Sequence, residues 1–264
     1  MSNLFDLHGK VAWVTGASVG GLGYYQALAL AEHGAHVALS DLSSRANDLA
    51  EAKSNLERKN LRAIALHTDV TNPDDVRDTV TNIDKEFGRI DILVNNAGVT
   101  VDVPALEMRL EDWNRVLNVN LTGVWLCSRA TAEAMIKRRI KGKIINIASV
   151  GGLGVSAFLP SSPYYATKAA VINLTRALAV EWAPYGINVN AIGPGVFHST
   201  GMTRQPKDAM DDAWISTVIS RTPLKRAGDP ARDLAGTLVF LASQASDYVT
   251  GQTIVVDGGR TAGF

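Results

Sequence analysis

Short runs of apolar and β-branched residues alternate with longer helical patterns along almost the whole chain. Such alternation is typical of βαβ units, in which helices pack on a parallel sheet. Several of the runs are apolar at every position, as strands covered on both faces must be. We therefore predict an α/β fold with a doubly wound, seven-stranded parallel sheet flanked by helices. The predicted strands span residues 11–15, 36–40, 63–67, 90–95, 143–148, 187–192 and 253–256.

Helical patterns separate these strands, among them residues 24–32, 73–87 and 163–182. The last begins after Ser161 and Ser162, which are suitable capping residues, with Pro163 in its first turn. No internal repeat, low-complexity tract or linker interrupts the series, so we expect a single domain over residues 1–264. One long irregular stretch, residues 197–226, is of a size that is usually functional in a compact domain.

The composition limits the partners that the chain can have. It carries 26 basic and 26 acidic side chains, so its formal net charge is zero and nothing global attracts nucleic acid or anionic lipid. The first residues lack the apolar core of a signal peptide, and no stretch offers about 18 uninterrupted apolar residues for a membrane span. The five histidines are scattered, which predicts no metal site. We expect a cytoplasmic protein without nucleic-acid or membrane partners.

A glycine-rich turn joins the first predicted strand to the first helix. It runs from Thr15 to Gly23 and includes Gly16, Gly20 and Gly21. Glycines let a backbone approach a pyrophosphate closely, and a helix N-terminus supplies free N–H groups and the positive end of a dipole. Because the turn leaves a strand and opens a helix, we predict that it binds the pyrophosphate of a nicotinamide dinucleotide in a Rossmann-type fold.

Asp41 lies at the end of the second strand, 18 residues after Gly23. The usual spacing for the acid that binds the adenosine ribose is about 20 residues. Its carboxylate can accept hydrogen bonds from the ribose hydroxyls, and it repels a 2′-phosphate by up to about 4 kcal/mol at an effective dielectric constant near 20. We therefore expect NAD as the cofactor and NADP less. Arg45 is near enough in sequence to keep the NADP alternative open.

Further motifs follow in a fixed order along the chain. With the glycine turn, they resemble the classical short-chain dehydrogenase/reductase family over nearly the whole chain. That resemblance implies an NAD(H)-dependent oxidoreductase that interconverts a secondary alcohol and a ketone, usually as a homotetramer. The motifs are Asp69-Val70, Asn95-Asn96-Ala97-Gly98, Asn118-Val119-Asn120, Ser149, Tyr164 with Lys168, Pro194-Gly195 and Asp257-Gly258-Gly259.

Tyr164 and Lys168 suit acid–base chemistry on physical grounds alone. Residues four apart near the start of a helix lie on one face, so the ammonium can lie beside the phenol. A cation at about 4 Å favours phenolate by roughly 4 kcal/mol, or about three pK units before desolvation opposes it. We therefore expect the pKa of Tyr164 to fall from about 10 toward neutrality, where general acid–base catalysis is efficient.

The resemblance assigns roles to the residues around this pair. It implies that Tyr164 exchanges a proton with the substrate oxygen, that Ser149 hydrogen-bonds the same oxygen, and that Lys168 also holds the nicotinamide ribose. Asn120 resembles the asparagine that holds a water joining the lysine to solvent. Ser149 and Tyr164 are 15 residues apart, two more than is common in the family, and we assign the extra residues to the loop at 151–162.

The resemblance also implies a set of cofactor-binding residues along these motifs. The glycine turn is one residue longer than the family pattern, and we favour Gly20 as the extra residue; the alternative uses Gly20 and shifts Leu22. Which hydroxyl of Ser199 and Thr200 meets the pyrophosphate stays open. The implied set is Gly16, Ser18, Gly21, Leu22, Gly23, Asp41, Asp69, Val70, Asn96, Ala97, Gly98, Tyr164, Lys168, Pro194, Gly195, Val196, Ser199 and Thr200.

The substrate is less constrained than the chemistry. The family places a substrate lid at residues 197–226, where this chain carries both apolar and basic side chains. An apolar lid suits an alicyclic or aromatic alcohol, whereas basic residues suit a sugar acid. The stretch 190–195 is similar to that of gluconate 5-dehydrogenase-like members, which favours a polyol or sugar acid. A second hypothesis is a non-catalytic dinucleotide sensor, and the retained Tyr164 and Lys168 argue against it.

Overall fold

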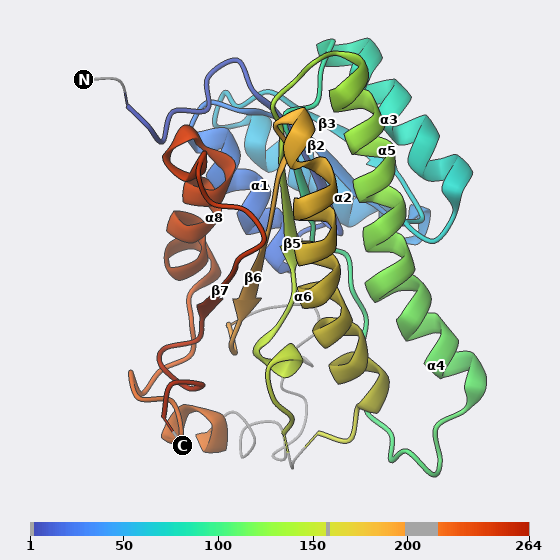
Figure 1. Cartoon of the computed structure of the whole chain (residues 1–264), viewed down its shortest axis with the longest axis vertical. Coiled ribbons are helices and arrows are strands. Elements are labelled where there is room, and N and C mark those ends of the chain that lie inside the picture. The colour runs from blue at the N-terminus through green and yellow to red at the C-terminus, as the bar shows by residue number, and fades with distance from the viewer. Residues whose placement is uncertain (1–2, 157–158, 199–215, 264) are drawn as a thin grey trace.

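Parallel strands build one sheet at the centre of the computed structural model, which describes residues 3–156, 159–198 and 216–263 (Figure 1). Within these residues the sheet has seven strands in the order β3-β2-β1-β4-β5-β6-β7, and all neighbouring pairs are parallel. This confirms the predicted fold class. The strands are β1 (Val11–Thr15), β2 (His36–Asp41), β3 (Ala63–His67), β4 (Ile92–Asn95), β5 (Lys143–Ile147), β6 (Asn188–Pro194) and β7 (Thr253–Val256).

Helices connect the strands and cover the sheet on both sides (Figure 1). The α-helices are α1 (Leu22–Glu32), α2 (Ala46–Glu57), α3 (Pro73–Phe87), α4 (Leu110–Leu117), α5 (Gly123–Lys137), α6 (Ser162–Trp182) and α8 (Ala235–Ala242). Short 3₁₀ turns are η1 (Ser43–Arg45), η3 (Val150–Gly152), η4 (Ala183–Tyr185) and η6 (Gln244–Ser246), and π-helical turns are η2 (Asn118–Thr122) and η5 (Pro230–Leu234). Residues 216–220 are also helical.

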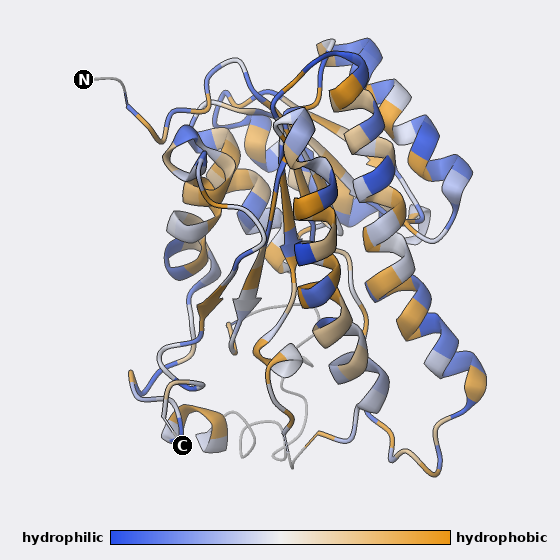
Figure 2. Cartoon of the chain, viewed as in Figure 1, coloured by the Kyte–Doolittle hydropathy of each residue, from blue (hydrophilic) through white to orange (hydrophobic). Residues whose placement is uncertain are grey.

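Alternate residues of each central strand enter two different cores. In β1, Ala12 and Val14 pack with residues of α1, α2 and α8, whereas Val11 and Trp13 pack with residues of α3, α5 and α6. All five residues of this strand are buried. The uniformly apolar strands therefore follow from burial on both faces, while the outer helices carry hydrophilic residues toward solvent (Figure 2).

Local signals in the sequence explain where α3 begins and ends. The Asn72 side chain accepts the Asp74 N–H at its first turn, and Pro73 occupies the first helical position. Gly88 ends the helix in the left-handed conformation at φ 77°. These are the residues that helix ends favour, because they satisfy free backbone groups or tolerate positive φ.

Some element boundaries differ from those predicted by a few residues. Helix α1 begins at Leu22 instead of residue 24, and β6 continues to Pro194, which pairs with Val256 of β7. Strand β4 begins at Ile92, because the buried Asp91 carboxylate accepts the Val11 N–H at the strand entrance.

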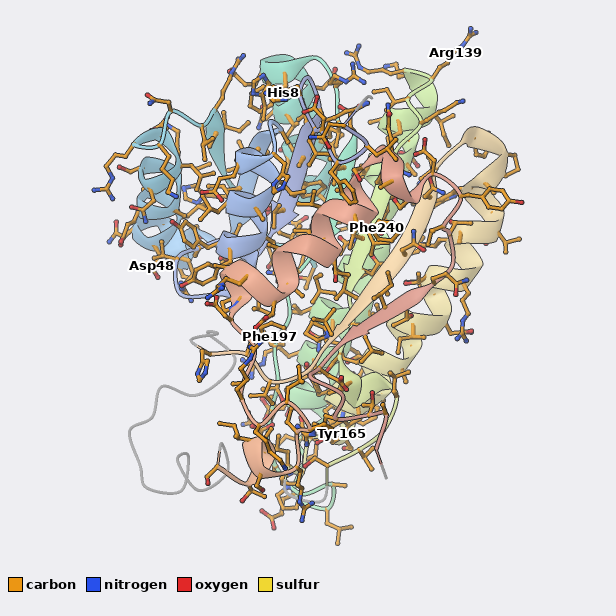
Figure 3. The ribbon with its side chains drawn as sticks, turned by 90° about the vertical axis from the view of Figure 1, so that its left-hand side faces the viewer. His8, Asp48, Arg139, Tyr165, Phe197 and Phe240 are labelled. Carbon is orange, nitrogen blue, oxygen red and sulfur yellow. The ribbon has the colours of Figure 1, made fainter. Side chains whose placement is uncertain are left out.

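The strand order reverses between β1 and β4, the two central strands whose chain connections run to opposite sides. In open α/β sheets, ligands bind outside the carboxyl ends of the strands at such a switch point. The carboxyl ends carry the predicted site motifs, and Figure 3 shows Phe197 and Tyr165 at that end, with His8 and Arg139 at the other. The fold therefore gathers the predicted motifs at one end of the sheet.

Candidate active site

The glycine turn leaves β1 at the switch point. Gly16 has φ 65°, and a Cβ built on it would lie 2.9 Å from the Ala97 Cα. A Cβ on Gly23 would lie 2.3 Å from the Gly16 carbonyl oxygen. Both positions therefore require glycine for steric reasons. Gly20 has φ 84° but open space around it, and Gly21 precedes the first residue of α1. This geometry supports the interpretation of Gly20 as the extra residue.

The side chains of Asn96, which follows β4, and Thr15, which ends β1, hold the turn in place. The Asn96 amide donates to the carbonyl oxygens of Thr15 and Gly16 at 2.9 Å each. The Thr15 hydroxyl in turn accepts the N–H groups of Asn96 and Ala97 at 3.0 Å each. Asn96, one of the predicted cofactor-binding residues, thus braces the glycine turn through its amide nitrogen.

Asp41 stands beside the turn. One of its carboxylate oxygens accepts the Ser18 N–H at 3.1 Å, and the other accepts the Leu42 N–H at 2.9 Å. The Ser18 hydroxyl is buried and has no hydrogen-bond partner within the described residues. Because an unpaired buried hydroxyl is costly, this atom marks a place where a ligand group would be bound. Ser18 and Asp41, both in the implied cofactor-binding set, thus come together beside the turn.

Asp69, one of the implied cofactor-binding residues, lies beyond the carboxyl end of β3. One of its carboxylate oxygens accepts both the N–H and the hydroxyl of Thr71, at 2.9 and 2.7 Å. Val70 beside it is buried, and a Cβ on Gly123 would meet its side chain at 2.8 Å. Asp69 therefore forms a local turn, and its other carboxylate oxygen has no hydrogen-bond donor within the described residues.

Tyr164, Ser149 and Lys168 come together at the start of α6. Ser149 follows β5, and its hydroxyl accepts the Gly151 N–H at 3.0 Å and is close enough to the Tyr164 phenol to lower the pKa of that group. The Lys168 Nζ lies 5.6 Å from the centroid of the Tyr164 ring and donates to the Ile147 carbonyl oxygen at 2.7 Å. The helix register thus places the phenol and the ammonium on one face, as predicted.

The electrostatics differ from the prediction for Tyr164. Burial raises the pKa of the Tyr164 phenol above its ordinary value, and the hydrogen bond from Ser149 opposes that shift only in part. Burial also lowers the pKa of Lys168 to about 8. The expected fall of the Tyr164 pKa is therefore wrong for this structure. The physical reason is that desolvation dominates, and that Lys168 donates to Ile147 instead of the phenol oxygen.

Asn120 lies in η2, a π-helical turn between α4 and α5, and it is fully buried. Its side-chain oxygen accepts the Val99 N–H at 2.8 Å, and its amide donates to the Val99 carbonyl at 2.9 Å and to Thr167 at 3.3 Å. A Cβ on Gly98 would lie 3.4 Å from the Asn120 oxygen and 3.6 Å from the Lys168 Nζ. Asn120 therefore fixes the chain after β4 beside the lysine, a role that sequence reasoning missed.

The turn after β6 brings in the next predicted residues. Gly195 donates its N–H to Val256, and a Cβ on it would lie 2.8 Å from the Asp257 Cα, so glycine is required where β6 meets β7. The Val196 carbonyl accepts the Gly228 N–H, which closes the base of the predicted lid. Pro194 ends β6. Ser199 and Thr200 lie outside the described residues.

The described ends of the lid, residues 197–198 and 216–226, carry both apolar and basic side chains. Phe197 and Val218 are buried, and they line a cavity of about 160 Å³ with Thr222 beyond β6 and β7. Other lid residues lie outside the described part of the chain: Met202, Arg204, Lys207, Met210, Trp214 and Ile215. A wider surface groove of about 450 Å³ lies beside the amino end of β3, and its lining includes Lys53, Glu57 and Arg62. It is remote from the carboxyl ends of the strands.

Two searches concern other kinds of site. Within residues 3–156, 159–198 and 216–263, no group of three or more His, Cys, Asp or Glu side chains is arranged to hold a metal ion. None of the helices described is long and apolar enough to cross a membrane. Burial raises the pKa of the Cys127 thiol far above its ordinary value, so this side chain is not a nucleophile at neutral pH.

Known proteins resemble this chain over nearly its full length. A family model described as enoyl-(acyl carrier protein) reductase matches residues 16–261. The 5-keto-D-gluconate 5-reductase of Escherichia coli is 40% identical over 98% of both chains, and a 3-oxoacyl-[acyl-carrier-protein] reductase of Synechocystis is 43% identical over 96% of this chain and 97% of its own. A gluconate 5-dehydrogenase from Burkholderia cenocepacia, solved with NADP and tartrate, has a TM-score of 0.89 at 37% identity, covering 99% and 98% of the two chains.

Proposed function

This chain belongs to the short-chain dehydrogenase/reductase family, and we propose that it interconverts a secondary alcohol and a ketone with Tyr164 as the general acid and base. The chain is an oxidoreductase that acts on CH–OH groups. The observation that carries the finer proposal is that the Tyr164 phenol and the Ser149 hydroxyl come together, with Lys168 buried and its Nζ 5.6 Å from the ring centroid. Because the Tyr164 phenol and the Ser149 hydroxyl lie together at the carboxyl end of the sheet, both can hydrogen-bond the same substrate oxygen.

The residues of the glycine turn fit a dinucleotide. The orphaned Ser18 hydroxyl and the free N–H groups at the start of α1 would hold its phosphates and ribose, and the bare backbone at Gly16 and Gly23 gives room for close approach. Asp41 would accept hydrogen bonds from the adenosine ribose. The cofactor, when bound, supplies or accepts the hydride, while the protein supplies placement and proton transfer.

Tyr164 holds the proton that the reaction moves. In ketone reduction the phenol donates its proton to the carbonyl oxygen as that oxygen gains charge; in alcohol oxidation the phenolate takes it back. Ser149 donates a hydrogen bond to the same oxygen and stabilises the charge that develops there. Lys168, when protonated, lowers the free energy of the phenolate through its charge. Its protonation therefore favours the oxidation direction.

We infer that NAD is preferred to NADP. The Asp41 carboxylate places a negative charge at the mouth of the turn, where the 2′-phosphate of NADP would lie. Arg45, the cation that could offset it, already pairs with Asp48 at 2.7 Å and donates to the Val19 carbonyl at 3.3 Å. Related gluconate 5-dehydrogenases have been solved with NADP, so the comparison of kcat/KM for the two cofactors is decisive. A higher value with NADP would contradict the inference.

The substrate class that we favour is a sugar acid or polyol. Relatives named for gluconate and 2-dehydro-3-deoxy-D-gluconate support it, whereas the reductases of 3-oxoacyl carrier protein support an acyl ketone instead. A screen of gluconate, polyols, alicyclic alcohols and a 3-oxoacyl thioester, read at the NADH absorbance, separates these classes. We expect turnover of the polyhydroxylated compounds.

Replacing Tyr164 by Phe tests the proposed mechanism. The variant loses the proton donor but keeps the ring, and we expect kcat to fall by about 10²- to 10⁴-fold, the usual contribution of general acid–base catalysis. Tyr165→Phe is the matched control, because its hydroxyl bonds the Leu159 carbonyl at 3.0 Å. NADH binding, followed by fluorescence, should be unchanged in both variants. Undiminished turnover by Tyr164→Phe would refute the assignment.

A further inference from the structure

The segment that follows β4 is fixed on both sides beside the reacting tyrosine. Asn120 bonds both backbone groups of Val99, as described above. On the other side, the Ser161 hydroxyl donates to the Val101 carbonyl oxygen at 2.8 Å and lies 2.8 Å from the Thr100 hydroxyl. Ser161 is the residue that precedes α6, so these bonds tie the segment to the first turn of the helix that carries Tyr164.

The segment ends on Asp102, whose carboxylate is only partly engaged. The Thr100 hydroxyl donates to one carboxylate oxygen at 2.8 Å. Within residues 3–156, 159–198 and 216–263, no Lys, Arg or His forms an ion pair with Asp102, and its second oxygen receives no hydrogen bond. The residue is half-buried. A carboxylate that is held by its neighbours and has a free oxygen is a ready acceptor for a donor from outside.

Asp102 acts on the reacting group electrostatically. Its negative charge contributes to raising the pKa of both the Tyr164 and the Tyr165 phenols. Arg260 acts on Tyr165 in the opposite sense, and Ser149 opposes the shift at Tyr164. The hydrogen bond from Thr100, together with the contact between Thr100 and Ser161, places the Asp102 carboxylate near the start of α6, where Tyr164 lies.

We propose that Asp102 is a specificity-determining residue whose free carboxylate oxygen accepts a hydrogen bond from a substrate hydroxyl next to the reacting carbon. This inference rests on the proposed alcohol dehydrogenase function and specifies its substrate class. A hydroxyl on the neighbouring carbon gains a charge-assisted hydrogen bond, which is about twice as strong as a neutral one. A substrate carboxylate at that position is repelled. The site thus selects polyhydroxylated chains whose acid group, if present, is remote from the carbon that reacts.

A pair of small alcohols isolates this contact. 2,3-Butanediol carries a hydroxyl beside the reacting carbon, and 2-butanol does not. In Asp102→Asn the acceptor of the Thr100 hydroxyl is kept but the charge is lost, and we expect kcat/KM for the diol to fall about ten- to hundredfold. For 2-butanol kcat/KM should change by no more than about twofold. Glu107→Gln, which removes an exposed carboxylate of the same loop, is the matched control and should alter neither value.

The pH profile gives an independent readout. Loss of the Asp102 charge lowers the pKa of Tyr164, so the limb of the kcat/KM profile that reports this group should move to lower pH in Asp102→Asn. The inference would be overturned if kcat/KM fell equally for both alcohols while the pH limb that reports Tyr164 stayed in place. It would also be overturned if kcat/KM for the diol did not fall. Absence of turnover of either alcohol and of gluconate by the wild type would overturn the proposed function itself, and this inference with it.

Discussion

The amine of Lys168 is buried away from solvent. Its residue is 3% exposed, and its Nζ has one hydrogen bond, to the Ile147 carbonyl. Burial lowers its pKa to about 8, so its charge changes just above neutral pH. Because that charge stabilises the Tyr164 phenolate, small changes in pH alter the proton balance of the whole site.

The titration of Lys168 predicts how stability depends on pH. The ordinary pKa of 10.5 applies to the unfolded chain, so between pH 8 and 10.5 the unfolded chain binds more protons at this group than the folded chain. The free energy of unfolding must therefore rise with pH across this window, by at most about 3 kcal/mol from this group. Below pH 8 the folded chain carries the full cost of the buried charge.

Lys168→Met removes this titration. In urea unfolding at pH 7.5 and pH 10, we expect the wild type to gain stability relative to the variant at the higher pH, by a difference on the order of 2–3 kcal/mol. The comparison between the two proteins cancels the titration of other groups. A difference that is the same at both pH values, or that changes in the opposite direction, would show that Lys168 keeps its ordinary pKa.

The sequence predicts the meeting of Tyr164, Lys168 and Ser149 but not their electrostatics. A spacing of four in a helix fixes a common face, and a position after a strand fixes the end of the sheet. The bond from Lys168 to Ile147, and the burial that raises the Tyr164 pKa, depend on packing that no local pattern encodes. Asp102 escaped notice for the same reason, since its position follows the Asn95–Gly98 motif but only tertiary contacts bring it beside α6.

At the scale of elements, the turn between β1 and α1 is fixed by backbone contacts more than by side chains. Gly16 packs against Ala97 and Gly23 packs against the Gly16 carbonyl oxygen so closely that neither has room for a Cβ, and Asn96 donates to the carbonyl oxygens of Thr15 and Gly16. The glycine spacing predicts this turn well, because the constraint is local. It does not predict the start of α1 at Leu22, since helix ends are set within one or two residues by such contacts.

Gly23→Ala should disturb the turn and the cofactor site together. The added methyl would lie 2.3 Å from the Gly16 carbonyl oxygen, and overpacking of this kind costs about 1–3 kcal/mol. We expect the Kd for NADH, measured by fluorescence titration, to rise about ten- to hundredfold. Gly236→Ala in α8 is the control, because open space surrounds it and alanine favours a helix. Equal NADH affinity in the two variants would show that the turn does not bind the cofactor.

Another element shows where local signals mislead. Ser161 precedes α6 as a capping residue should, and Ser162 is the first residue of the helix, yet Ser161 makes no side-chain cap bond. Its hydroxyl instead binds the Val101 carbonyl, from a segment 60 residues earlier in the chain. The helix begins at Ser162, one residue before the predicted start. Ser161, however, holds the segment beside the candidate active site and does not cap the helix through its side chain. A tertiary contact has replaced the local one.

At the scale of the whole molecule, the two ends of the sheet differ in their polar groups: the amino ends of the strands carry ion pairs, and the carboxyl ends carry the candidate active site. At the amino ends of the strands, the buried Asp91 carboxylate accepts the Val11 N–H and pairs with Arg89 and Lys10, while Lys143 pairs with Asp247. At the carboxyl ends lie an orphaned hydroxyl, a partly engaged carboxylate and a lysine of lowered pKa. The Ser18 hydroxyl, the second Asp102 oxygen and the Lys168 amine thus lie where a ligand would supply partners.

The central claim is that this chain transfers hydride, and does not only bind a dinucleotide. The most direct measurement supplies a secondary alcohol from the substrate screen with deuterium on its carbinol carbon, together with oxidised cofactor, and analyses the reduced cofactor by mass spectrometry. We predict that the cofactor gains one deuterium for each ketone formed, and that Tyr164→Phe slows the transfer by about 10²- to 10⁴-fold. Tight cofactor binding with no deuterium transferred from any of the screened alcohols would contradict the account.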